Sequence, residues 1–523
     1  MASSSSNRER TGRHAFLVAA GIFLTRIVGL VRQHFFSRYF GLGDVADAIS
    51  SAVRIPNILQ NLLGEGVLSA SFIPVYARLL AEGDEQEADR VAGAVLALLS
   101  LVTAVLVLLG VLAAPLLMPV IAPGYHGAKR ELTIELVRIL FPGLGVLVIS
   151  AWCLGILNSH RRFFLSYTAP VLWNLAIIGA LIGFRHQPQN RLAFTFAWAF
   201  VAGSALQTGI QLPVVLRLMR RLRPNLDTAD AQVREVVRNF VPVFIARGVV
   251  QISAYVDNLL ASLVATGAVA ALTTGQTLSV LPVSLFGMAV SAAELPAMSS
   301  ALGDAAQVAH ILRQRLNSGL RQIAFFVVPC AVVFAALGDV ATAVPFQNGD
   351  FTAQDSRYVW EMLGGAAIGL LASTLGRLYS STYWALRDTR TPLKFALVRV
   401  FLTTVLGYFC SIPLPRALGV DAHWGVFGLT ASAGIASWVE FTLLRRTLNR
   451  RIGATGIPAV LVGKLWGSAL LAAAAAWGVK LAIGMQRPVV DGLLILATFG
   501  GLYLALTLLL GVEECSRAVR RLL

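Results

Sequence analysis

The chain has 523 residues, of which 56% are hydrophobic and only 13% are charged, and its formal net charge is +16. Soluble domains carry about 25% charged residues, so the composition excludes a soluble globular protein and predicts an integral membrane protein. Its length is therefore counted in membrane spans of about 20 apolar residues each.

Fourteen apolar segments follow one another along the chain. The first comes after a polar, basic start and lacks the short apolar core and small-residue cleavage site of a signal peptide, so we expect it to remain as a span. Apolar runs of this length without alternation are helical. The predicted spans are 15–40, 45–77, 91–120, 133–158, 163–184, 192–216, 239–266, 268–300, 322–346, 358–384, 392–413, 422–444, 457–483 and 491–511.

The basic residues indicate the orientation of these spans. With the N-terminus in the cytoplasm, 26 Lys and Arg residues fall in cytoplasmic segments and 7 in external loops. Lys and Arg collect in the cytoplasmic loops of membrane proteins, and an even number of spans then places both ends of the chain in the cytoplasm. Because the basic residues are spread over eight segments, we expect no nucleic-acid partner.

Two pairs of prolines indicate an internal repeat. Pro74 and Pro296 follow similar sequences and are 222 residues apart, and so are Pro170 and Pro392. A repeat of six spans gives two units of the same orientation, related by an axis along the membrane normal. The predicted organisation is a tail (1–14), an N-lobe (15–220), a basic linker (221–238), a C-lobe (239–448), and two last helices with a C-terminal tail (449–523).

Charged residues inside the predicted spans are the candidates for function. A charge in mid-membrane costs at least about 2.5–3.5 kcal/mol, so it usually faces a protein interior or an aqueous cavity. Arg38 lies near the outer end of its span and is expected to snorkel to the interface. The candidates within spans or near their ends are Arg26, Arg32, Arg54, Asp47, Glu65, Arg138, Arg247, Asp257, Glu294, Arg377, Asp388 and Arg399.

Arg26, Arg32 and Arg54 fall in the middle of the first two spans. The planar guanidinium group suits phosphate oxygens, so one hypothesis is an anion site in a cavity between the lobes. The alternative is internal pairing with Asp47, Glu65 or backbone carbonyls. Asp257 stands alone in its span, and such a carboxylate is either paired or a ligand for a hard cation.

Motifs for enzymes and metal sites are missing from the sequence. It contains no GxSxG, HExxH or Walker-type pattern, and its seven histidines do not cluster. The four cysteines lack metal-type spacing, so we expect inert thiols. A transporter is therefore favoured over an enzyme. A membrane enzyme using Asp44 or Asp47 near an outer loop, and a scaffold without transport, stay open as alternatives.

The block "TRIVGLVRQHFFSRYFGLGDVADAISSAVRIPNILQNLLGEGVLSASFIPVYARLL" at 25–80 resembles the signature region of the MurJ (MviN) family of the MOP exporter superfamily. "APGYHG" (122–127), "GILNSHRRFFLSYTAPVLWNL" (155–175) and "YWALRDTRTPLK" (383–394) are similar to later motifs of that family. The resemblance implies two six-helix lobes around a cationic central cavity, plus two C-terminal helices forming a groove.

The resemblance also implies an activity: translocation of lipid II, the undecaprenyl-pyrophosphate-linked disaccharide-pentapeptide, to the outer leaflet of the bacterial cytoplasmic membrane by alternating access, for cell wall synthesis. Expected partners are lipid II, membrane lipids and cell wall synthesis proteins. No cofactor is required, and membrane potential or an ion gradient, with sodium as a candidate ion, drives the cycle. The alternative is export of another lipid-linked oligosaccharide or amphiphile.

Individual residues carry this resemblance. Arg26 and Arg32 match two cavity arginines of the family, and Asp47 and Glu65 match two of its acids. The sequence departs from the family at three cavity positions: Gln33 stands where many members have an acid, and Gln60 and Gln276 stand where arginines are expected, so that Arg54 would compensate in part. A sodium site described in some members implies Asp257, Asp388, Val400 and Thr404, although Trp384 replaces a further asparagine ligand.

Overall fold

A computed structural model of the chain describes residues 21, 23–219, 222, 224–227, 230–299 and 304–522. These ranges are helical almost throughout and contain no strand, which confirms the predicted all-α fold. The chain forms two compact units, Met1–Tyr255 and Val256–Leu523.

The division between the units falls inside α10 (Ala231–Val264), whereas the sequence analysis expected a lobe boundary in the linker at 221–238. The first half of α10 packs on the first unit: Val236 is buried in its core, and Glu235 accepts a hydrogen bond from Arg78 at 2.8 Å. This packing explains why most of α10 belongs to the first unit.

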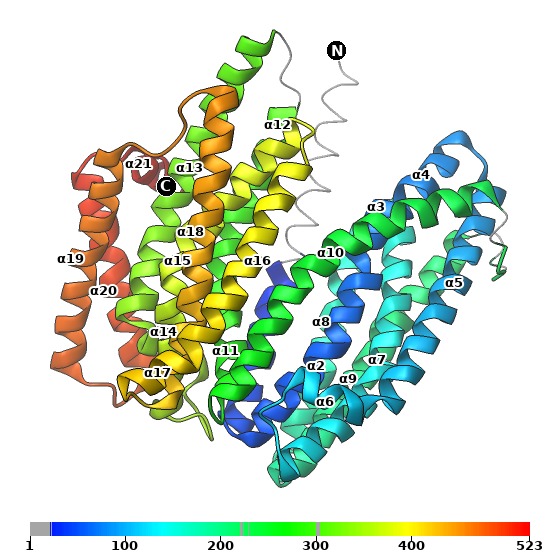
Figure 1. Ribbon diagram of the computed structural model, residues 1–523, viewed down its shortest axis with the longest axis horizontal. Coiled ribbons are helices and arrows are strands. Elements are labelled where there is room, and N and C mark those ends of the chain that lie inside the picture. Colours follow the sequence, from blue (N-terminus) through cyan, green and yellow to red (C-terminus); the bar gives the residue numbers. More distant parts are fainter. Residues whose placement is uncertain are drawn as a thin grey trace. The chain divides into compact units, whose positions relative to one another are not determined.

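The first unit is a bundle built around α7 (Gly127–Ser159), which contacts α2, α5 and α9 and buries much of its length (Figure 1). α7 is apolar on most of its faces, as expected for a helix surrounded by others. A helix over 23–40 precedes the bundle. The other helices are α2 (Asp44–Leu63), α3 (Glu65–Ser71), α4 (Ile73–Glu82), α5 (Glu85–Leu112), α6 (Ala114–Ile121), α8 (Phe163–Gly183) and α9 (Gln189–Leu218).

The second unit is built around α15 (Ala353–Ala385), which packs against α11, α13, α14 and α18. A continuous helical run joins α11 (Ala268–Pro282), the π-helix η1 (Val283–Met288) and α12 (Ala289–Ser299). The remaining elements are α13 (Ala305–Ala336), α14 (Gly338–Phe346), α16 (Arg390–Ser411), α17 (Pro413–Leu418), the 3-10 turn η2 (Ala422–Trp424), α18 (Gly425–Ile452), α19 (Ala459–Ile483), α20 (Pro488–Leu509) and α21 (Glu513–Leu522).

Within the described part of the chain, twelve helices are long and apolar enough to cross a membrane. They correspond to twelve of the fourteen predicted spans. The other two predictions, 15–40 and 239–266, coincide in their described residues with the helix over 23–40 and with α10, which carry more polar residues. Residues 15–20 and 22 of the first span lie outside the described residues. The predicted span 45–77 is divided into α2, α3 and α4, with Gly64 at the first break.

Two glycines bring α15 and α18 into close contact. A Cβ on Gly369 would overlap the backbone of Gly434, so the helices can approach only because both side chains are absent. We expect Gly369→Ala to reduce stability by about 1–3 kcal/mol, since the added methyl group must force the helices apart. Thermal unfolding of the purified protein in detergent measures this effect. Gly376→Ala on the same helix, where a Cβ meets no atom within 4 Å, is the matched control; equal midpoints for the two variants would contradict the prediction.

Candidate functional site

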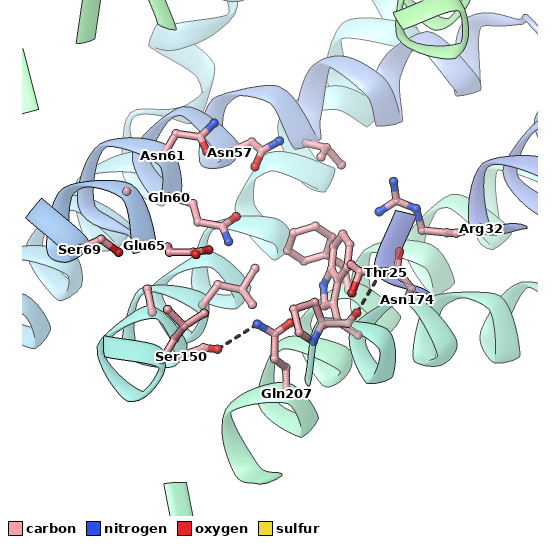
Figure 2. Close-up of a pocket in the computed structure, with 18 of the residues that line it drawn as sticks. Thr25, Arg32, Asn57, Gln60, Asn61, Glu65, Ser69, Ser150, Asn174 and Gln207 are labelled. Atoms are coloured by element: carbon pink, nitrogen blue, oxygen red, sulfur yellow. Dashed lines mark hydrogen bonds between the residues drawn. The ribbon is translucent and has the colours of Figure 1, made fainter. Parts of the chain in front are cut away.

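The first unit contains a cavity of about 670 Å³ between its helices. Apolar residues such as Leu147, Leu154 and Phe200 form part of the wall, and hydroxyl and amide side chains from several helices form the rest (Figure 2). Uncharged hydrogen-bonding side chains inside a membrane need polar partners, because lipid offers none. A cluster of them therefore indicates contact with each other or with a polar ligand. The neutral polar groups that line the cavity are Thr25, Asn57, Gln60, Asn61, Ser69, Ser150, Asn174 and Gln207.

Arg32 lies on one side of this cavity, and its guanidinium carbon is 4.9 Å from the centre of the Trp173 ring. Trp173 is fixed in turn by an edge-to-face contact with Phe200, with 4.9 Å between ring centres. Cation–π stacking is worth about 0.5–2 kcal/mol and occupies the face of the guanidinium group. The N–H groups point outward in the plane of the guanidinium group, where they can donate hydrogen bonds to phosphate or carboxylate oxygens.

A hydrogen-bonded series of side chains supports the opposite part of the wall. The Gln207 amide donates to Ser150 Oγ at 2.9 Å, and Ser150 Oγ donates to Gln211 Oε1 at 2.6 Å. All three side chains are buried. This chain of bonds fixes the orientation of Gln207, so the cavity presents a preformed rather than a flexible polar surface.

Three residues predicted for the site line this cavity: Arg32, Gln60 and Glu65. Figure 2 shows Arg32 and Glu65 on different sides, with Gln60 beside Glu65. Arg26 is exposed on the helix over 23–40 and is not among the residues that line the cavity. Arg54 donates from Nη2 to the carbonyl of Ala254 at 3.0 Å.

Asp47 occupies a different environment from the one suggested for a cavity acid. Its side chain is completely buried, and Oδ2 accepts a hydrogen bond from Lys129 Nζ at 2.6 Å. Lys129 also lies 3.0 Å from the exposed Asp44 and 4.2 Å from the centre of the Tyr125 ring. Asp47 is thus one half of a buried ion pair that joins α2 to α7. Lys129 falls between the predicted spans 91–120 and 133–158, in an external loop, and no local pattern connected it to an acid 82 positions earlier.

Trp173, Asn174 and Gln207 were also missed by the sequence analysis as site residues. The available signal was their polarity within otherwise apolar spans, because asparagine and glutamine in a membrane helix usually mark a packed or ligand-binding face. They carry no charge, which is the property that singled out the other candidates. Arg247 was singled out as an intramembrane charge, and it lines this cavity as well.

The second unit contains a smaller cavity of about 240 Å³. It is lined by Asp257, Gln276 and Arg377, together with serines of α11 and α15 and apolar side chains. Nearby on α16 and α18, Arg399 and Glu440 form an ion pair at 3.1 Å. Asp257 and Gln276 therefore share one cavity, as candidates from separate helices.

The four residues implied for a sodium ion are not brought together. Asp388 precedes the first residue of α16, whereas Thr404 lies fourteen residues into that helix, which is about 20 Å at 1.5 Å per residue. Thr404 Oγ1 donates to the carbonyl of Val400 at 2.9 Å, within the same helix. A cation reaches its oxygen ligands at about 2.3–2.6 Å, so Asp388 and Thr404 do not bind one ion in this arrangement. Among the described residues, no group of three or more His, Cys, Asp or Glu side chains is arranged to hold a metal.

Asp388 instead stabilises the start of α16. It accepts hydrogen bonds from the backbone N–H of Thr391 at 3.0 Å, from the Thr391 hydroxyl at 2.7 Å and from Arg451 Nη1 at 2.7 Å. These bonds, the backbone one first, lower the pKa of the Asp388 carboxyl group from 3.8 to about 2.

Because the folded-state pKa is lowered, Asp388 contributes stability above pH 3.8, and this contribution is lost as the pH falls from 3.8 to about 2. We expect Asp388→Asn to lower the unfolding midpoint at pH 6 and to have progressively less effect as the pH falls toward 2. Midpoints of the two proteins in detergent across this range measure the effect. A difference that stays constant over the whole range would contradict the assignment.

A bundle of membrane-spanning helices that encloses a preformed polar cavity with an arginine at its side defines the chain as a polytopic membrane transporter. The family model "Lipid II flippase MurJ" matches residues 36–499. The chain belongs to the MurJ family of lipid II flippases.

Individual relatives agree with this assignment. The lipid II flippase MurJ of Burkholderia cenocepacia is 30% identical over 444 residues, which cover 84% of each chain. The probable lipid II flippase MurJ of Bdellovibrio bacteriovorus is 29% identical over 533 residues, covering 98% of this chain and 97% of the relative. The family and the predicted resemblance are thereby confirmed.

Solved structures show the same fold. A lipid II flippase MurJ in an inward closed conformation superposes with a TM-score of 0.79 at 22% identity, covering 94% of this chain and 98% of that one. An inward-facing multidrug resistance MATE transporter of the MOP superfamily gives 0.67 at 16% identity, covering 83% of this chain and 98% of that one. The predicted all-helical fold is therefore confirmed.

Proposed function

We propose that this protein moves lipid II from the inner to the outer leaflet of the bacterial cytoplasmic membrane and is a transporter rather than an enzyme. Family membership supports lipid II as the substrate. The structural observation that supports it most directly is Arg32, which stacks on Trp173 at the side of a polar cavity inside the helix bundle. A guanidinium group in this setting suits a pyrophosphate, while the amide-rich wall suits sugar hydroxyl and peptide groups.

In the proposed cycle, the head group occupies the cavity and the polyprenyl tail stays among the lipids. The cavity opens alternately to the two sides of the membrane. A negative interior favours outward movement of an anion by about 2.3 kcal/mol per charge per 100 mV, so a membrane potential or an ion gradient suffices as a driving force. Both chain ends face the cytoplasm in this proposal, in agreement with the distribution of Lys and Arg.

A second candidate function follows from Gln60 and Gln276, which stand where the family resemblance places arginines. Each lines a cavity in its unit as a neutral side chain. Fewer positive charges would favour a lipid-linked oligosaccharide with fewer phosphates, or another amphiphile of the kind exported by the wider superfamily.

One experiment separates these functions. A strain depleted of its own lipid II flippase receives this gene, and lipid II exposure at the outer leaflet is measured directly with an externally added enzyme that cleaves it. Restored exposure and growth support the lipid II function. Full-level expression in the membrane with no restored exposure would contradict it and favour the second candidate, which transport of monophosphate-linked oligosaccharides in proteoliposomes then tests.

A further inference from the structure

Arg247 on α10 reaches the cavity of the first unit through a gap left by a glycine. Its guanidinium group lies directly against Gly66 of α3, and a Cβ at position 66 would overlap the guanidinium carbon and both terminal nitrogens. Glycine inside a helix costs about 1 kcal/mol relative to alanine. The space that the Arg247 guanidinium group occupies is a physical reason for glycine at position 66.

The hydrogen-bonding groups of Arg247 are available to a ligand. The side chain is exposed at the cavity, and within the described residues it makes no hydrogen bond or ion pair. Glu65 is near enough to interact with it electrostatically but not to form an ion pair. A guanidinium group has five N–H donors and no acceptor, so its natural partner in a membrane cavity is an anionic oxygen.

The contact with Gly66 places Arg247 on a different side of the cavity from Arg32. Gly66 follows Glu65 in α3, and Figure 2 shows Glu65 across the cavity from Arg32, with Gln60 beside Glu65 and Gln207 below them in this view. The charged side chains that line the cavity are Arg32, Arg247 and Glu65. The cavity thus has a cation on each of two sides, and neutral amide groups line other parts of its wall.

We propose that Arg247, seated on Gly66, is a second anion-binding residue of the cavity and supplies the cationic contact that Gln60 does not. For the identity of the ligand, this proposal rests on the proposed function. An elongated head group with a pyrophosphate, neutral sugars and peptide carboxylates matches a cavity that is cationic at two sides and also lined by amide groups. The anionic oxygen that Arg247 binds belongs either to the pyrophosphate or to a peptide carboxylate.

The test is equilibrium binding of radiolabelled lipid II and of undecaprenyl pyrophosphate to the purified full-length protein in nanodiscs. We expect Arg247→Gln to weaken lipid II binding about 10- to 100-fold, because a charge-assisted hydrogen bond pair is lost. Gly66→Ala should weaken binding to a similar extent by displacing the guanidinium group. In the Arg247→Gln background, Gly66→Ala should add little, since the seat then holds no guanidinium group.

The two ligands identify the source of the anionic oxygen. Equal weakening for both ligands assigns Arg247 to the pyrophosphate, and weakening for lipid II alone assigns it to a peptide carboxylate. An unchanged lipid II affinity in Arg247→Gln overturns the proposal, and so does a Gly66→Ala effect that persists in full in the Arg247→Gln background. If the wild-type protein binds undecaprenyl pyrophosphate but not lipid II, the proposed function fails, while Arg247→Gln with the former ligand still tests this residue.

A matched glycine controls for the change in helix propensity. Gly179→Ala lies on α8, where a Cβ meets no atom within 4 Å, and we expect wild-type affinity from it. Thermal midpoints of all variants show whether each one remains folded. Arg247→Lys keeps the charge but loses the planar fork, and an intermediate affinity is expected.

Discussion

Arg32→Gln is expected to reduce the rate of lipid II transport by about 10- to 100-fold. The substitution removes a positive charge and its bidentate donors from the cavity, and hydrogen bonds to charged groups contribute about 1.5–3 kcal/mol each. Glutamine keeps much of the volume and polarity of the side chain, so the loss reports on charge and geometry rather than on a hole. The measurement is the initial rate of lipid II translocation in proteoliposomes with an imposed potential.

The matched control for this prediction is Arg38→Gln on the same helix. Arg38 lies 5.8 Å from the centre of the Tyr39 ring and does not line the cavity. The same change of charge and volume is therefore made outside the site, and transport close to wild type is expected. If both variants lose transport equally, the effect belongs to the net charge of the helix, and the role assigned to Arg32 is wrong.

Asp47→Asn is expected to be strongly destabilising, by up to about 3–5 kcal/mol. Asp47 is completely buried and its carboxylate is 2.6 Å from Lys129 Nζ. Removing the buried charge leaves Lys129 with the exposed Asp44 at 3.0 Å, a partner that water screens, in place of a buried carboxylate. The expected result is a large fall in the thermal midpoint and reduced recovery of folded protein.

Asp44→Asn provides the internal comparison, because Asp44 contacts the same lysine at 3.0 Å but is 62% exposed. An exposed ion pair contributes about 0–1 kcal/mol, so this variant should unfold close to the wild-type midpoint. Replacing both members of the buried pair, as Asp47→Asn with Lys129→Met, should recover part of the loss. A stable Asp47→Asn protein that fails only in ligand binding would instead assign Asp47 to the substrate.

Much of this fold was predictable because a membrane restricts the choices available to a chain. The length of each apolar run defines a span. Such a span must be helical, because only a helix satisfies all of its backbone hydrogen bonds within the segment. Breaks within spans were harder to predict. The interruption of 45–77 falls at Gly64, a residue type that often ends helices, but glycines such as Gly179 lie inside unbroken helices, so the residue type alone did not predict the break.

For the site, the sequence determined by itself which residues are costly in a membrane, and it therefore singled out Arg32, Glu65 and Arg247 as candidates. Only the tertiary structure decided how each is used. Arg32 stacks on Trp173 and Arg247 passes over Gly66, so both line one cavity, whereas Asp47 is buried against Lys129. The physical reason is that charge and hydropathy are properties of single residues. A partner 82 or 181 positions away is determined by how helices pack, and that packing decides whether a charge is paired or left available to a ligand.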